Sequence, residues 1–187
     1  MQLVTHILVI ISSIILDDST SKSFDQNKLG VIEINLNLVS APVTFREYDL
    51  YELTNNYDSL NSQEIFGAYV QRYVKNTPAE IDYFYKFDGY ETVAVQLYER
   101  PQLASLLISD PKKFIKVGNL KLQPGSSIED LALPFQQFAK EHNALPEFGE
   151  ISDKDLSSSL EGKTVVRVIY DLQSEIIQKV VFIYSVL

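Results

Sequence analysis

The sequence has no cysteine and no tryptophan, and it has only two histidines in 187 residues. Without cysteine there are no disulfides, thiolate zinc sites or cysteine nucleophiles. His6 lies inside an apolar leader, so His142 is the one histidine in the remaining sequence, which argues against a serine triad or a histidine-based metal cluster. The nucleophile-elbow, dinucleotide-binding and Walker motifs are also missing. We therefore predict that the protein is not an enzyme and that it holds no metal and no cofactor.

Basic residues are in the minority, with 16 lysines and arginines against 25 acidic residues and a formal net charge of −9. A protein that binds the phosphates of nucleic acid needs clustered basic side chains, so we expect no nucleic-acid partner. One basic cluster does occur, and it consists of Lys112, Lys113, Lys116 and Lys121. We interpret it as a solvated face, with an anionic ligand as the alternative.

Residues 3–16 form an apolar run of a length that suits the hydrophobic region of a secretory signal and falls short of a membrane span. No basic residue precedes the run and no A-x-A site follows it. We interpret 1–16 as an export signal, with an uncleaved anchor or a buried element as alternatives. The expected location is periplasmic or secreted, and the alternatives are membrane-anchored or cytoplasmic. Residues 17–29 are predicted to be a polar linker and 30–187 a single globular domain.

Alternating apolar residues predict strands over 31–39, 164–172 and 176–187, together with hairpins over 80–99 and 113–122. The hairpin turns are assigned to Asp88-Gly89 and Gly118-Asn119. Helical spacing predicts three helices: one from Asn61 or Ser62 whose apolar stripe reaches Val74, one over 101–108, and one that starts at Ser126 and is interrupted by Pro134. These elements predict an α+β fold with a mostly antiparallel sheet of about six or seven strands and two or three packed helices.

Two tyrosine-rich segments are the candidate binding surface. The first is acidic and contributes Tyr48, Asp49, Tyr51 and Glu52, and the second is the 80–99 hairpin with Tyr83, Tyr85 and Tyr90. Tyrosine offers a large contact area at low entropic cost, which favours a docking surface. The alternative interpretation is a solvated connection in the first segment and core packing in the second.

The leading prediction is an exported, non-enzymatic domain that binds another protein, for example an immunity protein that neutralises a basic toxin. One alternative is a structural module of the bacterial envelope, held at the membrane by residues 3–16. A second alternative is a carboxylate-based hydrolase that uses a pair such as Glu129 with Asp130 or Asp153 with Asp155.

Overall fold

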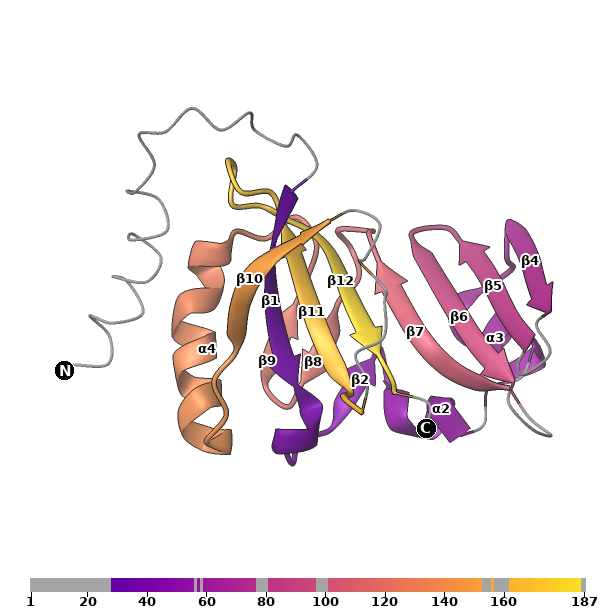
Figure 1. Cartoon of the computed structure of the whole chain (residues 1–187), viewed down its shortest axis with the longest axis horizontal. Helices are drawn as coiled ribbons and strands as arrows, with labels where there is room; N and C mark the ends of the chain where they lie inside the picture. Colours follow the sequence, from indigo (N-terminus) through magenta and orange to yellow (C-terminus); the bar gives the residue numbers. More distant parts are fainter. Residues whose placement is uncertain are drawn as a thin grey trace.

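The computed structural model describes residues 28–55, 57, 59–76, 81–96, 101–152, 156 and 162–185. The predicted export signal and most of the predicted linker lie outside these ranges. Two antiparallel sheets and three α-helices make up the described part (Figure 1), so the α+β class is confirmed. The larger sheet has eight strands, more than the six or seven predicted, and a second sheet of four short strands accompanies it.

The larger sheet is antiparallel between all neighbours. Its strands, in spatial order, are β10 (Glu147–Ser152), β1 (Lys28–Asn35), β11 (Val165–Tyr170), β12 (Ile177–Ile183), β7 (Gln102–Ile108), β6 (Tyr90–Gln96), β5 (Ile81–Phe87) and β4 (Gln71–Asn76). The two edges are therefore β10 and β4, which come from distant parts of the sequence.

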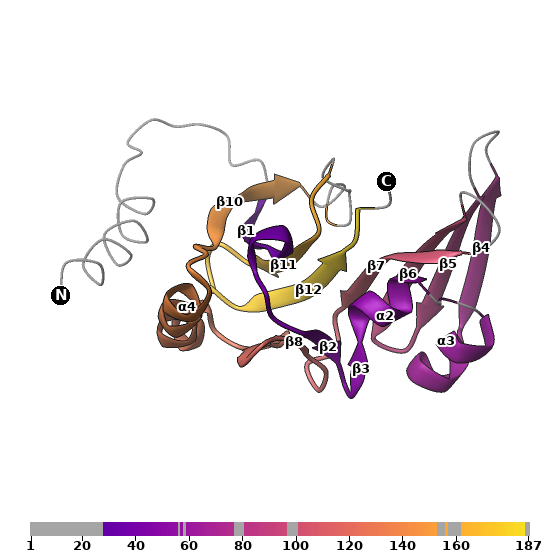
Figure 2. The same ribbon diagram turned by 90° about the horizontal axis from the view of Figure 1, so that it is seen from below.

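The smaller sheet has the order β3 (Tyr48–Asp49), β2 (Val43–Phe45), β8 (Ile115–Val117) and β9 (Leu120–Leu122). The helical elements are η1 (Leu36–Leu38), α2 (Leu50–Asn55), α3 (Ser59–Phe66) and α4 (Ile128–His142). Figure 2 shows β2, β3, β8, α2 and α3 on the same side of the larger sheet. The main hydrophobic core fills the space between these layers.

A second, smaller core lies on the other face of the larger sheet. It comprises Val31, Leu156, Val165, Ile169, Val181 and Ile183. Successive residues of a strand point to opposite faces, so β12 supplies Val180 and Phe182 to the main core and Val181 and Ile183 to the second one. The prediction that the last strand is interior to the sheet is confirmed, because β12 pairs with β11 and β7.

Both predicted hairpins are confirmed with their registers. Asp88-Gly89 connects β5 to β6, and Lys86 lies opposite Glu91. Gly118-Asn119 connects β8 to β9, and Val117 lies opposite Leu120. A two-residue turn that requires positive φ angles fixes the pairing of the strands on either side, and Gly89 has φ 78°.

The helix predicted from Asn61 to Val74 is wrong in its second half, because α3 ends at Phe66. Gly67 follows with φ 86°, and its N–H bonds to the carbonyl of Gln63 at 2.9 Å, which terminates the helix. The chain then re-enters the sheet as β4, where the β-branched and aromatic residues are favoured.

Two further helix predictions need correction. The helix predicted over 101–108 is strand β7, whose residues lie between β6 and β12. Helix α4 begins after Ser127, rather than Ser126, and continues through Pro134 without a break. The missing N–H of Pro134 leaves the carbonyl of Asp130 without its helical partner, and Asp130 is exposed, so water can satisfy that carbonyl.

Candidate functional site

The predicted acidic segment forms a continuous surface feature. Tyr48 and Asp49 make up β3, and Tyr51 and Glu52 belong to the first turn of α2. The Asp49 carboxylate accepts a hydrogen bond of 2.8 Å from the Tyr51 backbone N–H. The Tyr51 ring packs edge-on against Phe182, with 6.2 Å between centroids, so this half-buried ring contributes to the core as well as to the surface.

Two of the three hairpin tyrosines lie in the main core. Tyr85 is 5% exposed and Tyr90 is 4% exposed. The Tyr90 ring packs edge-on against Phe45 at 5.2 Å, and its hydroxyl accepts a hydrogen bond of 3.1 Å from Nη2 of Arg46. Tyr83 is partly exposed and donates its hydroxyl to Oε1 of Gln96 at 2.8 Å. Of these three side chains, Tyr83 alone presents area to an approaching partner.

The strongest candidate binding surface is an exposed apolar edge strand. This segment was predicted to be part of a helix. Strand β4 is exposed at all six positions, and no described strand pairs with its outer side. Tyr73 is 57% exposed, and Val70, which comes just before the strand, is 70% exposed. Tyr69 and Val74 are also exposed large side chains. Figure 1 shows β4 at one end of the molecule. We call residues 69–76 the β4 edge.

Aromatic side chains line both faces of the β4–β5 ribbon. On one face Tyr73 lies opposite Phe84, with 5.5 Å between ring centroids. On the other face Val74 lies opposite Tyr83. Arg72 shares this second face, where its guanidinium carbon lies 5.9 Å from the centroid of the Tyr83 ring. The cation is attracted to the electron-rich ring face, so Arg72 is drawn over the ribbon rather than out along the open edge.

Burial and hydrogen bonding shift the pKa values of several side chains among the described residues. Burial is the main cause that raises the pKa values of Tyr51 and Tyr85 above 10.0, so both phenols stay protonated at neutral pH. Hydrogen bonds from Ser174 and Gln173 hold the pKa of Asp171 below 3.8, as expected of a carboxylate that caps a turn. Within the described ranges, no three His, Cys, Asp or Glu side chains cluster as metal ligands.

Of the two predicted hydrolase pairs, the structure describes only Glu129 with Asp130. Glu129 and Asp130 are exposed side chains in the first turn of α4, where acidic residues interact favourably with the helix dipole. The backbone N–H of Glu129 donates to the hydroxyl of Ser127, which is the helix N-cap. Asp153 and Asp155 lie outside the described residues.

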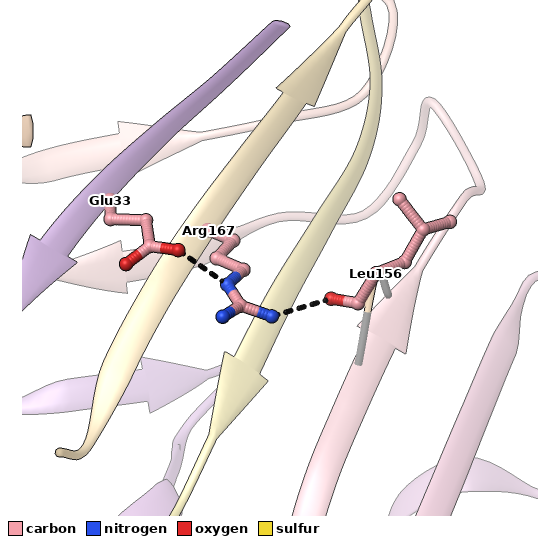
Figure 3. A network of polar contacts seen from close by, with 3 residues as sticks. All are labelled: Glu33, Leu156 and Arg167. Atoms are coloured by element: carbon pink, nitrogen blue, oxygen red, sulfur yellow. Dashed lines mark hydrogen bonds and ion pairs between the residues drawn. The ribbon is translucent and has the colours of Figure 1, made fainter. Parts of the chain in front are cut away.

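A buried ion pair on the second core was not predicted. Figure 3 shows the Arg167 guanidinium between the carboxylate of Glu33 and the carbonyl of Leu156. Nε of Arg167 lies 2.7 Å from Oε1 of Glu33, and Nη1 lies 3.3 Å from the Leu156 oxygen. Arg167 occupies an inward position in an otherwise apolar strand, VVRVIY, which is the sequence signal that could have revealed it. The contacts join β1, β11 and Leu156, so we interpret the group as structural.

Comparison of the chain with protein-family models, with curated protein sequences and with solved structures found no match. In the part of the chain that the structure describes, no helix has both the length and the apolar character needed to cross a membrane.

Proposed function

We propose that this protein is an exported, non-enzymatic protein-binding domain that takes an extended segment of its partner as an added strand along the β4 edge. The observation that carries the proposal is an edge strand that is exposed at all six positions and has large apolar side chains on both faces. Proteins usually protect such edges with charge, proline, bulges or covering elements, because an open edge is a template for another strand. Here Lys75 and Arg72 are the charged residues of the strand, and Arg72 lies over the Tyr83 ring.

The chemistry of the edge fits strand addition. Alternate residues of a strand direct their backbone groups to the same side, so β4 offers about three N–H and three C=O groups to a new neighbour. Each hydrogen bond contributes only about 1 kcal/mol net, so the backbone supplies orientation and part of the affinity. Tyr73 and Val70 supply apolar area, and a tyrosine of this exposure can become a dominant contact when it is covered.

The charge of the whole chain bears on the identity of the partner. A net charge of −9 attracts a basic protein over distances longer than any contact and raises its association rate. Glu47 and Glu52 are exposed acidic residues beside β3 and in α2. An immunity protein that neutralises a basic toxin remains the concrete form of the proposal, in which charge brings the partner near and the β4 edge retains it.

Site-specific photo-crosslinking tests the proposal directly. A photoreactive amino acid is placed at Tyr73 in the full chain, in cells of the native host, and a matched control carries it at Leu133 on α4, which is 70% exposed. We expect one prominent crosslinked protein from position 73 and none of the same mass from position 133. The same products from both positions, or no product from position 73, would refute the proposal.

The captured protein is then purified and its affinity is measured by titration calorimetry against two variants. Val70→Lys/Tyr73→Lys puts charge on the β4 edge, and Leu133→Lys/Leu145→Lys puts the same charge at positions that are 70% and 69% exposed. We expect at least about a tenfold loss of affinity for the first variant and wild-type affinity for the second, since losing one dominant contact costs about 2 kcal/mol. Equal affinities would show that β4 is not the binding edge.

A further inference from the structure

Two lysines of the smaller sheet face each other without an acidic counter-charge. Lys116 on β8 and Lys121 on β9 are direct cross-strand partners, and both side chains are exposed. The centroid of the Phe114 ring lies 5.6 Å from Nζ of Lys116 and 4.5 Å from Nζ of Lys121. Like charges directly opposite each other destabilise a strand pair, and cation–π attraction to one ring offsets this only in part.

The surrounding residues extend this positive charge. Lys112 is exposed, and Nζ of Lys113 lies 6.0 Å from the centroid of the Tyr90 ring. Asp110 is close in sequence, and its carboxylate, which accepts the backbone N–H of Lys112 at 2.8 Å, offsets one of these positive charges. Among the described residues, none of these lysines forms an ion pair. We call Lys112, Lys113, Phe114, Lys116 and Lys121 the lysine face.

The lysine face lies on the outer surface of a small sheet. The inward positions of β8 and β9 are buried, whereas Lys116 and Lys121 point outward. The outward row continues through Thr44 to Asp49, which lies two strands away from Lys116. That separation is about 10 Å, somewhat more than the screening length of about 8 Å at physiological ionic strength. The charge of Asp49 therefore weakens but does not cancel the attraction of the lysines for anions, although the chain as a whole has a net charge of −9.

We propose that the lysine face is a docking surface for an anionic lipid bilayer, separate from the β4 edge. Lys116 and Lys121 lie side by side on the outer face of β8 and β9. This arrangement suits contact with an extended, negatively charged membrane surface. Each lysine close to an anionic lipid surface strengthens binding about fivefold. An aromatic ring beside the lysines can insert favourably among the lipid headgroups. Residues 3–16 are predicted to be an export signal, an anchor or a buried element, and either of the first two would bring the chain to a membrane during its biogenesis.

Vesicle co-sedimentation of the full chain tests this proposal. The probes are vesicles of phosphatidylcholine alone and vesicles of phosphatidylcholine with phosphatidylglycerol. Residues 3–16 can associate with either lipid, so the measured quantity is the ratio of the two partition coefficients. The variant Lys116→Gln/Lys121→Gln is compared with Lys75→Gln/Lys86→Gln, which removes two charges from β4 and β5.

We expect the wild-type ratio to be at least about 25 at low salt, and to fall by about 25-fold, towards one, in the Lys116→Gln/Lys121→Gln variant. The matched control keeps the wild-type ratio. Salt of about 1 M shortens the screening length to about 3 Å and lowers the wild-type ratio as well. A ratio near one for the wild type, or equal ratios for both variants, would overturn the proposal. So would binding to soluble poly-glutamate with no preference for the anionic vesicles, since that would assign the face to acidic polypeptides.

Discussion

Glu33 and Arg167 lie directly opposite each other on β1 and β11, and their side chains form an ion pair of 2.7 Å on the second core. The arginine side chain is 2% exposed and the glutamate side chain is 18% exposed (Figure 3). The guanidinium also donates to the carbonyl of Leu156, a residue that belongs to the same core. One cation thus links β1 and β11 to Leu156.

Glu33→Ala should lower the free energy of unfolding by about 3 kcal/mol, because it removes the carboxylate partner of a buried guanidinium. Urea denaturation followed by circular dichroism measures this loss. The control is Glu91→Ala, which breaks the exposed pair between Lys86 and Glu91 at 3.6 Å and should cost less than about 1 kcal/mol. Similar losses in the two variants would show that the buried pair has no special structural role.

Gly30→Ala should destabilise the protein by at least about 1 kcal/mol. Gly30 lies opposite Tyr170 in the sheet, and a Cβ atom at residue 30 would come within 2.2 Å of Cζ of that ring. The ring must move, and displacing well-packed groups costs about 1–3 kcal/mol. Gly149→Ala on the neighbouring strand is the matched control, because its Cβ would meet the nearest atom, Cγ1 of Val31, at an ordinary 3.6 Å. Thermal unfolding of both variants checks the difference, and a neutral Gly30→Ala would contradict it.

Stability should fall as the pH rises above about 10. Burial is the main cause that raises the pKa values of Tyr51, Tyr85 and Tyr170 above their ordinary value of 10.0. The unfolded chain therefore loses these protons at a lower pH than the folded chain does. The contribution of each tyrosine is complete below pH 10.0 and is lost as the pH rises through its folded pKa.

The measurement is the free energy of unfolding from about pH 8 to about pH 11, in the wild type and in Tyr170→Phe. The variant lacks one of the shifted phenols, so its stability should fall less steeply with pH. A wild-type stability that is constant or rises over this range would contradict the assignment of these tyrosines to protected sites.

Lys121→Glu should raise the free energy of unfolding by roughly 0.5–1 kcal/mol, because it converts an opposed pair of like charges into a cross-strand ion pair with Lys116. Thermal unfolding at low salt shows the gain most clearly, since salt screens both pairs. Lys75→Glu, a change of the same type on exposed β4, places a second acidic side chain opposite Asp82 and should lower the stability instead. A loss of stability in Lys121→Glu would mean that repulsion between Lys116 and Lys121 does not destabilise the folded protein.

Local sequence determines the parts of the fold that were predicted correctly. Asp88-Gly89 and Gly118-Asn119 each specify a turn of two residues, and such a turn fixes the pairing of every residue on either side. The apolar residues on both faces of β12 predicted an interior strand, since a strand with that composition needs cover on both sides. Neither inference needed knowledge of distant contacts.

Two of the incorrect helix predictions share one cause, which is that short apolar segments satisfy more than one periodicity. Residues 101–108 can be written as a short helix with proline at its first position, but they form a strand between β6, which precedes them, and β12, which is distant in sequence. The residues around Tyr73 fit a helical stripe equally well, and Gly67 ends that helix before the stripe is complete. The β4 edge was not predicted as a binding surface for this reason. Residues such as Tyr73 were assigned to the buried face of a helix and so were not expected to be exposed.

The two edges of the larger sheet differ in a way that limits how the protein can assemble. β4 has Tyr73 and Val74, whereas β10 begins with Glu147 and also has Glu150, beside Gly149. A fibre can grow when an edge strand of one molecule pairs with an edge strand of the next. Glu147 and Glu150 would bring like charges together where two copies of β10 meet, which opposes that pairing. Strand addition at β4, as proposed, would thus leave a second edge that resists pairing with its own copy.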